Sequence, residues 1–127
     1  MRRFLSVAFV TLLIVPMPAI SGDGGGIGLK ARLQILTEDD FQENVVGHEA
    51  THRSGDSFIA YRNGKLTGTV DGAKLTATWY WQGKTWCNKG NAGSLRISAC
   101  YRLELDGNRL HRKPAKGGNT MTYRMKF

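Results

Sequence analysis

Residues 95–105 read LRISACYRLEL, and this stretch decides the fold. Apolar side chains occupy every second position from Leu95 to Leu105, while arginine, serine, cysteine and glutamate fill the positions between them. A period of two is typical of a β-strand, because successive side chains point to opposite faces of a sheet. The stretch therefore predicts a long strand with one buried face and one wet face.

Similar alternating runs lie on both sides of this strand, and turn sequences separate them. Asn63-Gly64, a strong hairpin signal, lies between residues 57–62 and 65–70. Further turns are expected at Asp71-Gly72, Gly83-Lys84 and Asp106-Gly107-Asn108. The other main runs are residues 73–82, 109–113 and 119–127. Together they predict an all-β fold, a small antiparallel meander or barrel of seven or eight strands.

One short helix is expected before the strands, over residues 38–46. Thr37 is a suitable N-cap, and acidic residues fill the first turn after it, where they favour the positive end of the helix dipole. Phe41 and Val45 have helical spacing, and Gly47 can end the helix. The helix therefore has one apolar side that needs a partner in the core.

The first 21 residues have the layout of a secretory signal peptide. A basic start is followed by a short apolar run, and small residues precede an expected cleavage site near Ser21 and Gly22. Residues 22–36 are expected to form a flexible glycine-rich lead, and residues 37–127 a single domain. No second apolar segment is long enough to span a bilayer. A chain of 127 residues also leaves no room for a typical multidomain enzyme. We therefore expect a periplasmic or secreted protein.

Two cysteines, Cys87 and Cys100, are the only ones in the chain. An even number in an exported protein predicts a disulfide, and here only one pairing exists. Cys100 lies on the polar face of its strand, so the bridge is expected on the outer wall of the barrel. The spacing fits neither a redox motif nor a zinc ribbon.

Charge is divided unevenly along the chain. Residues 37–56 carry six acidic residues and one arginine, whereas residues 57–127 carry thirteen basic and three acidic residues. Nucleic-acid binding is not expected, because the aromatic residues alternate onto the inner face and do not interleave with the arginines. A cationic exterior is expected to solvate the sheet or to bind an anionic component of the cell envelope; its candidate residues are Arg96, Arg102, Arg112, Arg124 and Lys126.

Residues 48–52 spell HEATH and match the HExxH motif of zinc peptidases. On a helix, His48 and His52 would bind zinc, and Glu49 would act as general base. Here Gly47 precedes the motif and a Ser-Gly-Asp turn follows it, so a helix has little room. An extended strand is the preferred interpretation, and zinc hydrolysis remains the lesser alternative.

The stretch from Phe41 to Phe127 resembles a family of small exported alphaproteobacterial proteins of unknown function. The shared elements are a short helix ending in glycine, a hairpin, a W-x-W segment, two cysteines and an acidic-Gly turn. In this chain they are Val46-Gly47, Asn63-Gly64, Thr78-Trp79-Tyr80-Trp81, Cys87, Cys100 and Asp106-Gly107. The resemblance implies a lipocalin-like or calycin-like barrel. Some members carry the label dihydrodipicolinate reductase, but this chain lacks the βαβ unit that binds a dinucleotide.

These observations favour a non-enzymatic binding protein that needs no cofactor. A small barrel can hold one apolar or amphipathic ligand at an open end, although many such barrels fill their interior with side chains. The inward aromatic residues that could line a ligand site are Phe58, Trp79, Trp81, Tyr101 and Tyr123. An inhibitor or a protein that interacts with the cell envelope through its cationic surface is the alternative.

Overall fold

The computed structural model describes residues 32–127. The expected signal peptide, its cleavage site and most of the glycine-rich lead lie outside the described residues. One helix and nine strands follow Arg32: β1 (Leu33–Ile35), α1 (Glu38–Asn44), β2 (Glu49–His52), β3 (Ser57–Ala60), β4 (Lys65–Val70), β5 (Ala73–Gln82), β6 (Thr85–Ala92), β7 (Leu95–Asp106), β8 (Arg109–Pro114) and β9 (Met121–Lys126).

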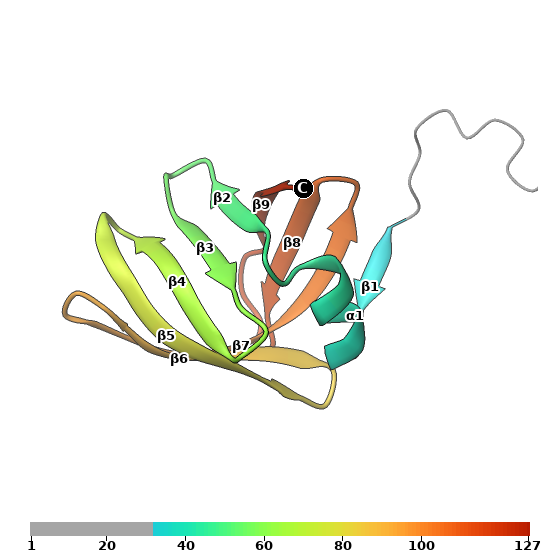
Figure 1. The fold of residues 1–127 in the computed structure, drawn as a ribbon, viewed down its shortest axis with the longest axis horizontal. Helices are drawn as coiled ribbons and strands as arrows, with labels where there is room; N and C mark the ends of the chain where they lie inside the picture. The colour runs from blue at the N-terminus through green and yellow to red at the C-terminus, as the bar shows by residue number, and fades with distance from the viewer. Residues whose placement is uncertain (1–31) are drawn as a thin grey trace, which may run out of the picture.

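Strands β2 to β9 form a closed antiparallel barrel. Each of these strands pairs with the next one along the chain, and β9 returns to pair with β2. The polypeptide therefore winds once around a common interior, as the ribbon shows (Figure 1). The all-β prediction is confirmed, and closure adds that β2 has a partner on both sides and is not an edge strand.

Strand β1 lies where the sequence analysis did not expect a strand. Leu33–Ile35 pairs with residues 103–105 of β7, within the segment expected to be a flexible lead. Ile35 is fully buried, which anchors this short strand to the core. Its three residues are too few for the alternation of a strand to be recognised in the sequence.

Helix α1 begins as the sequence predicts. The Thr37 hydroxyl accepts a hydrogen bond from the backbone N–H of Asp40 at 3.1 Å, and three acidic residues fill the first turn. The helix ends at Asn44, two residues before its expected end, and Gly47 follows with a positive φ of 83°. Phe41 and Val45 are fully buried, so the apolar side of the helix packs into the barrel.

The two ends of the barrel differ. At one end, the ring of Phe41 lies 4.9 Å from the ring of Trp79, 5.7 Å from that of Trp81 and 5.3 Å from that of Trp86. These rings close the interior beneath α1. At the other end, the turns after β2, β4 and β6 surround a depression that no helix of residues 32–127 covers.

The disulfide joins Cys87 of β6 to Cys100 of β7, which lie directly opposite each other in the ladder. The adjacent pair, Trp86 and Tyr101, contributes its rings to the interior. Because neighbouring residues on a strand point to opposite faces, the bridge lies on the outer face of the sheet, as predicted.

Candidate ligand-binding cavity

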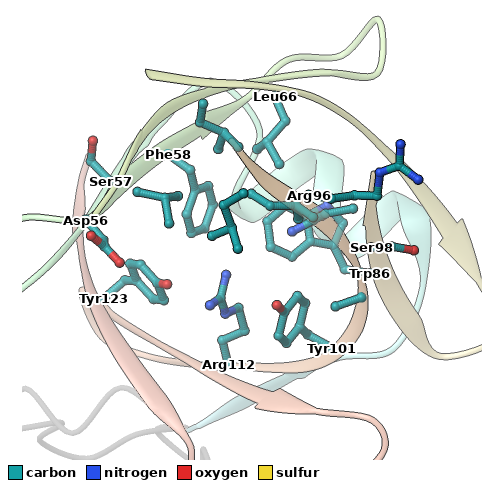
Figure 2. Close-up of a pocket in the computed structure, with 16 residues that line it drawn as sticks. Asp56, Ser57, Phe58, Leu66, Trp86, Arg96, Ser98, Tyr101, Arg112 and Tyr123 are labelled. Atoms are coloured by element: carbon teal, nitrogen blue, oxygen red, sulfur yellow. The ribbon is translucent and has the colours of Figure 1, made fainter. Parts of the chain in front are cut away.

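A cavity of about 300 Å³ opens at the end of the barrel opposite α1. Its deeper wall is apolar, and its polar groups come from several strands and from the turn after β2 (Figure 2). The apolar lining includes Phe58, Leu66, Val70, Leu75, Trp86 and Ile97. The polar lining includes Asp56, Ser57, Asn88, Arg96, Ser98, Tyr101, Arg112 and Tyr123.

Aromatic side chains pack against one another in the wall of the cavity. Phe58 lies 5.0 Å from Trp86 and 5.1 Å from Tyr123 between ring centroids, and Trp86 lies 6.2 Å from Tyr101. Such offset and edge-to-face arrangements stabilise a core beyond simple burial, by about 0.5–1.5 kcal/mol per pair. The cavity therefore has a rigid wall along much of its depth.

Arg112 of β8 points into this cavity, which corrects its expected place on the cationic exterior. Its guanidinium carbon lies 4.1 Å from the ring centroid of Tyr101 and 5.1 Å from that of Tyr123. In Figure 2 the guanidinium rises between these two rings toward the centre of the cavity. The strand register explains the position, because Arg112 lies opposite buried Leu103 on β7 and shares a face with buried Leu110.

Three buried polar atoms of the lining have no hydrogen-bond partner among residues 32–127. They are Nε1 of Trp86, Oδ1 of Asn88 and Nε of Arg112. Trp86 is fully buried and Asn88 is 4 % exposed. Buried donors and acceptors are almost always paired, since an unmade hydrogen bond costs about 1–3 kcal/mol. Two donors and one acceptor therefore remain unpaired in the wall of the cavity, although little of their own surface is open to it.

The hydroxyl of Tyr123 is a further donor. Burial raises the pKa of Tyr123 above its ordinary value of 10.0; the Arg112 guanidinium opposes this shift, and Asp56 adds to it. The phenol is therefore protonated at neutral pH. Its contact within the protein is a long one, 3.9 Å to the sulfur of Met121, which is a weak acceptor.

The cavity brings together three of the five aromatic residues that the sequence suggested as a ligand site. Phe58, Tyr101 and Tyr123 line it. Trp79 and Trp81 lie at the opposite end, against Phe41. Their indole N–H groups already donate within the protein, to the carbonyl oxygens of Tyr61 and Gly83 at 2.8 and 2.9 Å.

Trp86 and Arg112 are two of the cavity residues that the sequence analysis did not assign to a ligand site, although each had a sequence signal. Cys87 was expected on the outer wall, so its neighbour Trp86 had to point inward. Arg112 follows Leu110 by two residues and therefore shares its face. In a strand, side chains two positions apart point to the same face, so a residue two positions from an inward apolar side chain also points inward.

The HExxH residues lie in and next to a strand and not in a helix, which is the interpretation that the sequence analysis preferred. Glu49–His52 is β2, and His48 comes just before it. Over four residues, an extended chain separates Cα atoms by about 13 Å at roughly 3.3 Å per residue. His48 packs 4.9 Å from the ring of Phe127, while Nδ1 of His52 is 2.8 Å from the hydroxyl of Ser54. The two imidazoles therefore face different surroundings and do not form the pair that a peptidase zinc site requires.

The outer wall carries the other expected basic residues. Arg96, Arg102, Arg124 and Lys126 are exposed. Arg124 of β9 lies directly opposite Arg109 of β8, and both line a shallow outer groove with Arg53. Like charges in direct cross-strand positions repel each other. The lining of this groove contains three arginines and no carboxylate, while Asp106 of β7 lies opposite Arg109 on its other side.

Within the described residues 32–127, no helix is long and apolar enough to cross a bilayer.

Comparison of the chain with protein-family models, with curated proteins and with solved structures finds no match.

Proposed function

We propose that this protein is a non-enzymatic binding protein that holds one small molecule in the open end of its barrel. The observation that carries the proposal is the cavity of about 300 Å³ with unpartnered polar atoms of Trp86, Asn88 and Arg112 in its wall. Its volume lies at the lower limit of typical ligand pockets, which span roughly 300–1,000 Å³.

The cavity is open to solvent at the end of the barrel, so water fills it when no ligand is bound. A ligand with matching polar groups would replace that water and keep the hydrogen bonds that it makes with the wall.

The site of action in this proposal is the periplasm or the extracellular space. The layout of residues 1–21 and the disulfide between Cys87 and Cys100 both support export. Mass spectrometry of the exported protein should find a new N-terminus near Gly22. An intact Met1 in a periplasmic fraction would contradict export.

The binding proposal is tested with a neutral fluorescent probe, naphthol, in a saturation titration. Ala99→Phe and Ile97→Trp should abolish binding, because both positions line the cavity and the larger side chains would occupy it. Thr76→Phe adds the same ring at an exposed position of β5 and is the matched control. Saturable binding with one site in the wild type and the control, and its loss in the two cavity variants, is the expected result. Undiminished binding in both cavity variants, or none in the wild type, would overturn the proposal.

The cationic outer groove favours a second function, interaction with an anionic component of the envelope or inhibition of an acidic partner. The observation that supports this second function is that Arg109 and Arg124 lie directly opposite each other on neighbouring strands. The wild-type protein should sediment together with phosphatidylglycerol vesicles at low salt, where the attraction between exposed charges is not screened. The Arg109→Glu variant should stay in the supernatant. Equal retention of the two proteins would exclude the groove from this role.

A further inference from the structure

We infer that the cavity is built for a compact organic acid whose carboxylate pairs with the guanidinium of Arg112. The inference rests on the proposed binding function and names the chemical class of the ligand. The charge of Arg112 is the starting observation, because its guanidinium points into the cavity between the rings of Tyr101 and Tyr123.

Arg112 has no acidic partner within the described part of the chain. The ion pairs among residues 32–127 involve Arg32, His111, Glu104 and Asp106, and none of them includes Arg112. Nη2 of Arg112 donates to the sulfur of Met121 at 3.3 Å, a weak acceptor, and Nε has no partner. The side chain is half-buried, so an anion that enters the cavity would replace the water that otherwise reaches the guanidinium.

The tyrosine rings hold the guanidinium without satisfying its hydrogen bonds. Tyr101 and Tyr123 contact its carbon through their ring faces, at 4.1 and 5.1 Å from the centroids. This cation–π contact compensates part of the burial cost and fixes the group in place. The N–H donors at the edge of the guanidinium remain, and a carboxylate matches their fork-like geometry with two parallel hydrogen bonds.

The remaining polar groups agree with an anion. The lining contains two arginines, Arg96 and Arg112, and one carboxylate, that of Asp56. Asp56 accepts a hydrogen bond at Oδ1 from the backbone N–H of Asp71 at 3.0 Å, and the lining keeps one positive charge in excess because it has two arginines and one carboxylate. The hydroxyl of Tyr123, protonated at neutral pH, adds a donor on the same side as Arg112 (Figure 2).

The volume sets the size of the ligand. At roughly 30 Å³ for each water-sized group, 300 Å³ has room for about ten non-hydrogen atoms. The wall of Phe58, Leu66 and Trp86 suits an apolar body of this size. An aryl or short alkyl carboxylic acid fits these limits, whereas most of a long-chain fatty acid would remain outside the mouth.

The test compares phenylacetate with phenylacetamide, a neutral molecule of nearly the same shape, by isothermal titration at neutral pH. Wild-type protein should bind the acid more tightly by roughly tenfold to a hundredfold, the range of a charged hydrogen-bonded contact. Arg112→Met should remove this preference while naphthol still binds. Arg112→Lys should keep part of it, because the charge remains and the fork is lost. Arg102→Met, at an exposed position on the outer face of β7 and outside the cavity lining, is the control and should keep the preference in full.

Each outcome is decisive. Equal affinity of the wild type for acid and amide, or an acid preference that survives in Arg112→Met, would overturn the inference; naphthol binding would then leave the proposed function intact. If neither naphthol nor the acid binds, the proposed function fails as well. Should Arg112→Met not fold, the Nε–H resonance of Arg112 in the wild type decides, since phenylacetate should shift it and phenylacetamide should not.

Discussion

Replacing Phe41 with alanine should destabilise the domain strongly, because this side chain closes one end of the barrel. Phe41 is fully buried and meets three tryptophans, Trp79, Trp81 and Trp86, with centroid distances of 4.9, 5.7 and 5.3 Å. Truncation would remove the ring that α1 inserts into this cluster. The helix would then keep Val45 as its remaining fully buried side chain.

The expected loss is near the upper end of the range for such a change. Phe→Ala substitutions in cores cost about 3–5 kcal/mol, more where the surroundings cannot collapse into the void. Here the indole N–H groups of Trp79 and Trp81 are tied to backbone carbonyl oxygens at 2.8 and 2.9 Å, so their rings have little freedom to move. We therefore expect about 4–5 kcal/mol, and a melting temperature lower by roughly 20–25 °C in a domain of this size.

Urea unfolding followed by circular dichroism measures this loss. Glu43→Ala, at an exposed position of the same helix, is the matched control and should change stability by less than about 0.5 kcal/mol. Phe41→Leu keeps much of the volume and should cost less than Phe41→Ala. A loss below about 1.5 kcal/mol for Phe41→Ala, within the range of volume-conserving core changes, would refute the role of this ring as the closing group.

Three further predictions concern the sheet. Reduction of the Cys87–Cys100 disulfide should lower the melting temperature by about 15 °C, since a closed loop of this length contributes roughly 3 kcal/mol on a chain-entropy account. Calorimetry with and without reductant measures the shift, and an unchanged melting temperature would contradict the prediction. Gly68→Ala should lower the free energy of unfolding by more than about 1 kcal/mol, and by more than Gly72→Ala does. A Cβ at Gly68 would collide with the backbone of β3, whereas a Cβ at Gly72 would face open space. Chemical unfolding of the two variants measures this order. Burial raises the pKa of Tyr123 in the folded state, so the unfolded chain loses this proton first as the pH rises. The free energy of unfolding should therefore fall as the pH rises above about 10 through the folded pKa. In unfolding curves measured at several alkaline pH values, Tyr123→Phe should lose less stability than the wild type, and an equal loss in both proteins would refute this role of Tyr123.

The local pattern of the sequence predicts most of the barrel. Strands β4 and β5 have the boundaries that the turn residues indicate, and the strand at 49–52 follows from a glycine on one side and a turn on the other. The position of the disulfide on the outer wall follows from the alternation around Cys100. These features depend on neighbours a few residues apart, where the two-residue period of a strand acts directly.

The composition of the cavity was predicted in part. Alternation correctly indicates that Phe58, Trp79 and Tyr123 face the interior, and all three are buried. It contains no information on how far along the barrel axis a side chain lies. The division between an aromatic floor at Trp79 and an open cavity at Tyr123 therefore could not be derived from the pattern.

What the sequence by itself determined is thus the class of fold, the face of most side chains, the helix cap at Thr37 and the single disulfide. Only the tertiary structure decided that β9 closes on β2, that α1 blocks one end, and that Arg112 reaches the interior between two tyrosines. The physical reason is the range of the interactions. Alternation and capping act between residues close in the chain, whereas closure and axial position depend on strand stagger and on packing between residues far apart in sequence.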